Sequence, residues 1–104
     1  MIASKEDAAA ELGQSHLSVE NGIVAVYRLV GDNEEDDTEP IKLLLVNEYT
    51  IEQGIEPLLF GPDRANGLPF WLVIVDVSPA EFARVNSGEL PLPHGWKLGQ
   101  KLAG

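Results

Sequence analysis

Six carboxylates stand within eight residues of this chain, and this acidic run is its densest group of side chains that could bind a ligand. Loops rich in Asp and Glu supply the oxygen ligands that calcium prefers. The spacing does not fit an EF-hand, because counting from the first Asp there is no Gly at the sixth position and no Glu at the twelfth. We therefore expect no metal site and weigh two interpretations, a solvated loop and a surface that steers a partner electrostatically. The carboxylates are Asp32, Glu34, Glu35, Asp36, Asp37 and Glu39.

Asp76 is the second candidate, because it interrupts an apolar stretch two residues before Ser78, a predicted helix N-cap. Carboxylates near the end of a strand often project into sites, and functional carboxylates often have perturbed pKa values. The alternative is that Asp76 accepts hydrogen bonds from the nearby helix terminus or faces water.

The two histidines are the side chains whose unperturbed pKa lies near neutrality, so either could act as a general base. His94 lies in a Pro-His-Gly-Trp stretch that is typical of a turn, and His16 lies in a polar segment with no evident orienting partner. Their unrelated positions make no metal signature. If a pocket forms between the sheet and the C-terminal tail, its polar groups and walls would be Glu48, Tyr49, Trp71, Asp76, His94 and Trp96.

No motif for nucleophilic or phosphate chemistry is present. The chain has no cysteine, and Ser87-Gly88 does not match the nucleophile elbow Gly-x-Ser-x-Gly. The loop over residues 61–69 is neither a P-loop nor a dinucleotide fingerprint, but its Asp63 and Arg64 could contact a partner. We therefore expect no cofactor, and binding rather than catalysis.

A strand followed by a capped helix is the clearest structural signal. Residues 68–77 are rich in branched and aromatic side chains, which favours a buried strand. Ser78 and Glu81 form a predicted capping box with Pro79 between them, and Gly88 ends the helix.

The remaining elements follow from alternation and punctuation. We expect a helix over residues 4–12 ended by Gly13, and an antiparallel pair of strands. A short strand containing Pro57 should lie at an edge of the sheet, or Pro57 should stand at the start of that strand. Residues 47–55 fit a strand extension or a turn, and residues 90–104 an extended Pro-rich tail. The expected strands are residues 23–30, 41–46 and 56–60.

These elements predict an α+β fold in one domain over residues 1–104, an antiparallel sheet of three to five strands with one or two helices on one face. Residues 70–77 are apolar on both faces. We therefore predict either a homo-oligomer that covers one face, or coverage within the chain by the N-terminal helix and the tail.

The charge distribution limits the ligands. Residues 1–62 hold 13 of the 17 acidic residues but 3 of the 7 basic ones, so this part accounts for the whole net charge of −10. Phosphate backbones and anionic membranes need a basic surface, so we expect neither nucleic acid nor membrane as a ligand. With no signal-peptide pattern and no cysteine, we expect a soluble cytoplasmic protein.

The function that fits these observations is a non-catalytic module that binds a protein partner of basic character. The acidic loop over residues 31–40 would steer the partner, and the loop over residues 61–69 would contact it. The alternative is a small-molecule-binding protein or minor enzyme that uses the pocket described above.

Overall fold

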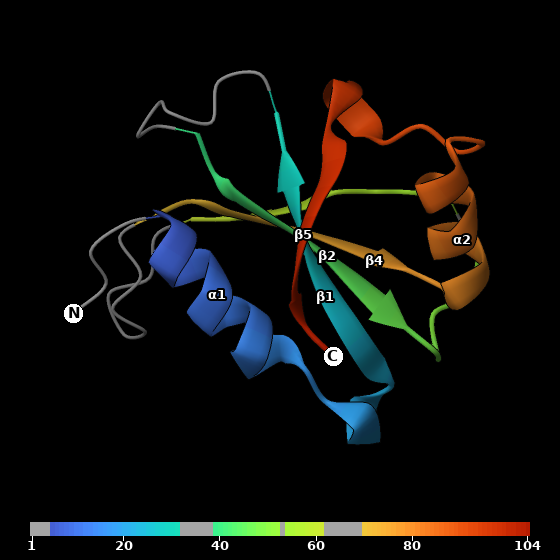
Figure 1. Cartoon of the computed structure of the whole chain (residues 1–104), viewed down its shortest axis with the longest axis horizontal. Helices are drawn as coiled ribbons and strands as arrows, with labels where there is room; N and C mark the ends of the chain where they lie inside the picture. Colours follow the sequence, from blue (N-terminus) through green and yellow to red (C-terminus); the bar gives the residue numbers. More distant parts are fainter. Residues whose placement is uncertain (1–4, 32–38, 53, 62–69) are drawn as a thin grey trace.

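The computed structural model describes residues 5–31, 39–52, 54–61 and 70–104, which form one five-stranded sheet with a helix on each face (Figure 1). The strand order is β3-β4-β2-β1-β5. In chain order the elements are α1 (Lys5–His16), the 3-10 helix η1 (Val19–Asn21), β1 (Ile23–Val30), β2 (Ile41–Asn47), β3 (Leu58–Phe60), β4 (Leu72–Val77), α2 (Pro79–Ser87), the 3-10 helix η2 (Pro93–Gly95) and β5 (Lys97–Ala103).

The sheet is mixed, which corrects the prediction of a purely antiparallel sheet while confirming the α+β class. β1 pairs antiparallel with β2 and β5, and β3 pairs antiparallel with β4, but β2 and β4 run parallel from Ile41↔Leu72 to Val46↔Val77. The physical reason lies in the strands themselves. β4 is apolar on both faces and takes an interior place, whereas the three-residue β3, which follows Pro57, takes the edge.

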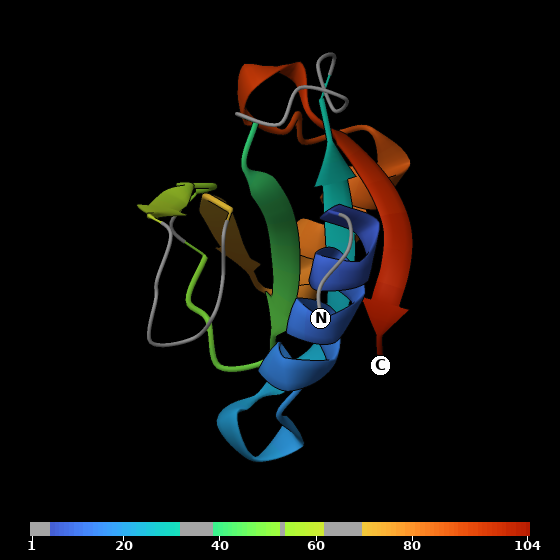
Figure 2. The same ribbon diagram turned by 90° about the vertical axis from the view of Figure 1, so that its left-hand side faces the viewer.

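The two helices cover opposite faces of the sheet, so the prediction that they share one face is wrong. Side chains of β2 alternate between the faces: Leu43 belongs to the cluster that contains Ala8 and Ala9 of α1, and Leu44 to the cluster that receives Phe82 of α2. Figure 2 shows α1 in front of the strands and α2 behind them. Both apolar faces of the central strands are thus covered within the chain. The apolar faces of β4 therefore no longer support the predicted homo-oligomer, which stays a prediction.

α1 runs to His16, past Gly13, where the sequence predicted its end. Ala8 and Ala9 are completely buried, so the alanine-rich face lies directly on the sheet. A glycine inside a helix usually costs stability, but here its missing side chain makes room for a neighbouring strand.

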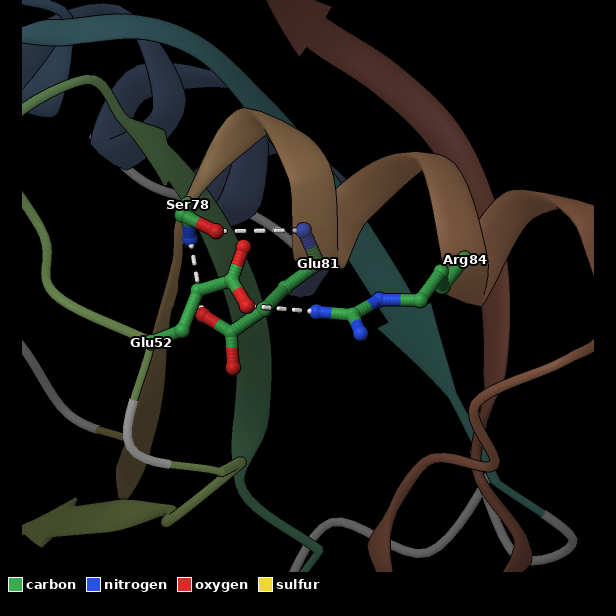
Figure 3. Close-up of polar contacts among 4 residues, drawn as sticks. All are labelled: Glu52, Ser78, Glu81 and Arg84. Atoms are coloured by element: carbon green, nitrogen blue, oxygen red, sulfur yellow. Dashed lines mark hydrogen bonds and ion pairs between the residues drawn. The ribbon is translucent and has the colours of Figure 1, made fainter.

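α2 has the bounds that the sequence predicted. Ser78 Oγ accepts a hydrogen bond from the Glu81 backbone N–H at 3.1 Å, and Glu81 Oε1 accepts one from the Ser78 N–H at 3.0 Å (Figure 3). Gly88 ends the helix in the left-handed conformation, with φ of 87°. This reciprocal pair is the predicted capping box.

The sequence predicted a tail that is extended throughout residues 90–104, and this prediction is wrong at η2. The tail forms η2 and then β5, which pairs with β1 from Val30↔Lys97 to Val26↔Ala103 and makes the second edge of the sheet. The prolines end at Pro93, so residues 97–103 all carry backbone N–H groups for a strand ladder.

Candidate partner-binding surface

Large apolar side chains are exposed together at the β3 edge of the sheet. Leu58, Leu59 and Phe60 are 51%, 63% and 48% exposed, and Trp71, just before β4, is 47% exposed. The Trp71 ring lies against Gly61, which follows β3, since a Cβ built on that glycine would be 3.3 Å from the ring. We call Leu58, Leu59, Phe60 and Trp71 the β3 surface.

β3 is exposed because neither helix reaches it. α1 packs against β5, β1 and β2, whereas α2 packs against β2 and β4. The register with β4 places Leu58 and Phe60 on the α1 side of the sheet and Leu59 on the α2 side. Both sides of β3 are therefore open within the described part of the chain. In Figure 2 the strand stands at the left-hand margin, away from both helices.

The two edges of the sheet differ in chemistry. β5 carries exposed Lys97, Gln100 and Lys101, and lysines on an edge strand discourage pairing with another chain. β3 has no charged residue, and within the described residues its edge is protected by its short length and by Pro57 before it. The β3 edge is thus the one that offers backbone groups and apolar side chains together.

Contacts on the approach to β3 hold it in position. Arg84 Nη2 of α2 donates to Glu52 Oε2 at 2.9 Å and ties the connection between β2 and β3 to the helix (Figure 3). Ile55, further along the same connection, packs against the cluster on the α2 side. From there the chain reaches β3, which is fixed by its pairing with β4.

Negative charge flanks the β3 surface. Glu56 is exposed, lies two residues before β3, and has no ion pair with any described residue. The carboxylate of Glu52, in contrast, is partly neutralised by Arg84. A ligand at this edge therefore meets apolar side chains beside a carboxylate that no described residue neutralises.

Comparison of the chain with protein-family models, with curated proteins and with solved structures gave no match. No residue role can be transferred from a relative, so each candidate is judged by its position and exposure. By that standard the β3 surface is the leading candidate. Sequence reasoning placed a short strand here but missed the surface, although three apolar residues after a proline, with no charge among them, were a usable signal.

Most residues of the predicted partner-binding loops lie outside the described residues. Those residues are Asp32, Glu34, Glu35, Asp36, Asp37, Asp63 and Arg64. Glu39 is described, and its Oε2 lies 3.6 Å from Nζ of Lys42, a side chain that is only 1% exposed. Glu39 therefore contributes an ion pair at the start of β2.

The predicted pocket does not assemble as one site. A shallow groove of about 240 Å³ does lie between the end of α2 and the tail, with Val85, Leu92 and Trp96 among its lining residues. Trp96 is the only one of the six predicted pocket residues that lines it. His94 packs on Trp96 at 5.1 Å between ring centroids, with a left-handed φ of 56°.

The other predicted pocket residues lie elsewhere. Trp71 belongs to the β3 surface, and Glu48 and Tyr49 follow the end of β2, where both are exposed and the Tyr49 N–H donates to Asn47 Oδ1 at 2.9 Å. Within the described part of the chain, no group of three His, Cys, Asp or Glu side chains is placed to hold a metal ion. Neither described helix has the length and apolar sequence needed to cross a bilayer.

Asp76 and His94 lie on opposite faces and near opposite ends of the sheet. Asp76 pairs with Leu45, and Leu45 with Val26. Lys97, which follows His94 by three residues, pairs with Val30, so it is about 13 Å further along β1. This separation exceeds the reach of direct proton transfer between the two side chains.

The charged neighbour of Asp76 is His16, at the end of α1. Partial burial raises the pKa of the Asp76 carboxyl, and the nearby His16 charge acts in the opposite direction. Asp76 and His16 do not line the groove beside Trp96, and among the described residues they do not belong to a group of three possible metal ligands. We therefore assign Asp76 and His16 no catalytic role.

Proposed function

We propose that the protein is a non-catalytic protein-binding module whose docking site is the β3 surface. The observation that carries this proposal is the grouping of Leu58, Leu59, Phe60 and Trp71, each about half exposed, at an uncharged sheet edge. Single apolar residues on a surface are ordinary, but grouped ones mark interaction sites. The opposite edge strand, β5, carries exposed lysines instead. Other large apolar side chains, Val19, Tyr49 and Ile51, are also exposed, but none of them belongs to an edge strand.

The net charge of −10 supports a basic partner, as the sequence predicted. Opposite charge on the two surfaces raises the association rate and selects against acidic competitors. A cytoplasmic setting is part of this proposal, and the absence of cysteine is compatible with it.

A small-molecule function in the groove beside Trp96 is the weaker candidate. Its volume of about 240 Å³ is below the range of about 300–1,000 Å³ that is typical of ligand pockets. The candidate acid and base, Asp76 and His94, also lie on opposite faces of the sheet, so the groove contains no acid–base pair from the predicted set.

The test is affinity capture from a lysate of the source organism with three forms of the chain: wild type, Leu59→Lys and Gln100→Lys. Both variants add one positive charge to an exposed edge position, so they match in charge and differ only in the edge that they change. Each should unfold within about 0.5 kcal/mol of wild type, because neither position is buried.

We expect one protein to be captured in stoichiometric amount by wild type and by Gln100→Lys, and to be lost with Leu59→Lys. Capture that Leu59→Lys leaves unchanged would remove the β3 surface as the docking site. If no protein is captured by wild type at low or high salt, the protein-binding function is contradicted and the groove becomes the leading candidate.

A further inference from the structure

We infer that the β3 surface receives an extended, basic segment of the partner, which pairs with β3 as a sixth strand of the sheet. This inference rests on the proposed function and adds the conformation and charge of what is bound. It follows from three features of the edge: its open backbone, the division of its apolar side chains between two faces, and its charge.

The backbone of β3 offers a template on one side only. Among the described strands its single neighbour is β4, so the alternate N–H and C=O groups that point away from β4 have no strand partner. Three residues give about 10 Å of edge, which is enough for a segment of three to five residues. Addition of a strand to an exposed edge is a common way in which proteins bind peptides.

The side chains of the β3 surface are divided between the two faces. Leu58 and Phe60 lie on the α1 side, whereas Leu59 lies on the α2 side, and the alternation of β4 places Trp71 there too. A bound strand would place successive side chains beside one group and then the other. A ligand with several apolar residues in succession therefore fits this edge better than one with a single apolar face.

Charge decides between a basic partner and a second copy of this chain. Glu56 stands exposed beside the edge with no ion pair among the described residues, and it attracts a lysine or arginine that flanks the bound strand. A second copy would bring its own Glu56 to the same place, on a chain whose overall net charge is also −10. Like charges at an interface disfavour that pairing, so the edge favours a basic segment.

The experiment titrates ¹⁵N-labelled protein with a capped heptapeptide of three valines flanked by two lysines at each end. Two control peptides replace the lysines with glutamates, or the central valine with proline, which removes an N–H needed for a strand ladder. We expect saturable shifts of the amides of Glu56 and residues 58–60 with the lysine peptide, and no binding of either control.

Two protein variants complete the test. Glu56→Gln should weaken the lysine peptide about two- to five-fold, the effect expected of one exposed ion pair, whereas Glu20→Gln on η1 should leave the affinity unchanged. The affinity of wild type should also fall as salt rises.

Equal binding of the proline peptide would overturn strand addition, and equal binding of the glutamate peptide would overturn the basic partner. No shift at the amides of Glu56 and residues 58–60 with the lysine peptide would overturn the inference as a whole. If Leu59→Lys still abolished capture of the partner in that case, the proposed function would stand without it. Concentration-dependent dimerisation through the same amides, with no peptide binding, would identify a second copy as the occupant and overturn the inference.

Discussion

Gly13 of α1 lies so close to Leu102 of β5 that a Cβ atom on the glycine would stand 2.6 Å from the Leu102 Cβ. The next residue reinforces the contact, because Gln14 Nε2 donates to the Leu102 carbonyl oxygen at 3.0 Å. The glycine therefore permits the approach of helix to strand, at a position where the sequence alone predicted the end of the helix.

Gly13→Ala should destabilise the protein by about 1–2 kcal/mol. A methyl group at this position overpacks the contact with Leu102, which costs about 1–3 kcal/mol, and the better helix propensity of alanine returns about 1 kcal/mol at most. Urea unfolding of Gly13→Ala measures the loss, with Ser15→Ala on the exposed side of the same helix as the control. If Gly13→Ala stabilised the protein as Ser15→Ala should, the close contact would be contradicted.

Ser78→Ala should cost about 1–2 kcal/mol, because it removes the oxygen that accepts the Glu81 N–H at the start of α2. Ser87 near the end of the same helix is exposed, and Ser87→Ala should change the free energy of unfolding by less than about 0.5 kcal/mol. Denaturant unfolding of both variants compares them directly. If both variants lost the same free energy of unfolding, the capping box would contribute no more than an exposed serine near the end of the helix.

Lys42→Ala should destabilise the protein by about 2 kcal/mol or more. The side chain is only 1% exposed, and its Nζ lies 5.7 Å from the centre of the Trp96 ring, so truncation removes buried packing as well as charge. Lys101→Ala at an exposed position of β5 is the matched control and should cost less than about 0.5 kcal/mol.

Lys42→Met separates the two contributions of that lysine, since it keeps the unbranched stem and removes the charge. If packing dominates, Lys42→Met should retain most of the stability that Lys42→Ala loses. A loss as large as that of Lys42→Ala would instead place the stabilisation in the ammonium group and its polar contacts, among them those with Glu39 and the Pro40 carbonyl oxygen.

Asp76→Asn should raise the melting temperature at pH 7 by a small amount, because Asp76 remains an exposed residue and its carboxyl is only partly buried. Burial raises the pKa of Asp76 in the folded protein, against the smaller opposite effect of His16, so in the window between the unfolded and folded pKa values the folded state binds more protons. Stability is therefore lost as pH rises through that window, and the penalty is complete at neutral pH. The asparagine carries no charge, so the variant avoids the cost of partly burying a carboxylate.

The gain from Asp76→Asn should disappear below about pH 4, the unfolded pKa of an aspartate, where wild type also carries a neutral side chain. Melting temperatures of wild type and variant between pH 3 and pH 7 measure this difference. A gain that is the same at every pH would exclude burial of the charge as its cause.

The local elements of this protein could be predicted from residues near one another in the chain. The capping box joins Ser78 and Glu81 across three residues, and the strand alternation of β1 and β2 depends on neighbours two positions apart. Signals of this range predicted α2, β1, all of β2 but its last residue, and a short strand near Pro57, for which an edge position was one of two alternatives. These elements can be predicted from the sequence because the residue pattern that indicates each element lies within the element itself.

The arrangement of these elements needed contacts between distant parts of the chain. Gly13 signals a helix end by its type, yet the helix continues, because the glycine meets Leu102 on a strand at the other end of the chain. The parallel pairing of β2 with β4 and the opposite placement of α1 and α2 are likewise contacts across the chain. The β3 surface has the same origin, since Leu59 is exposed because both helices pack mainly on other strands. The uncharged apolar run after Pro57 indicates an edge strand, but it does not say which strands the helices cover.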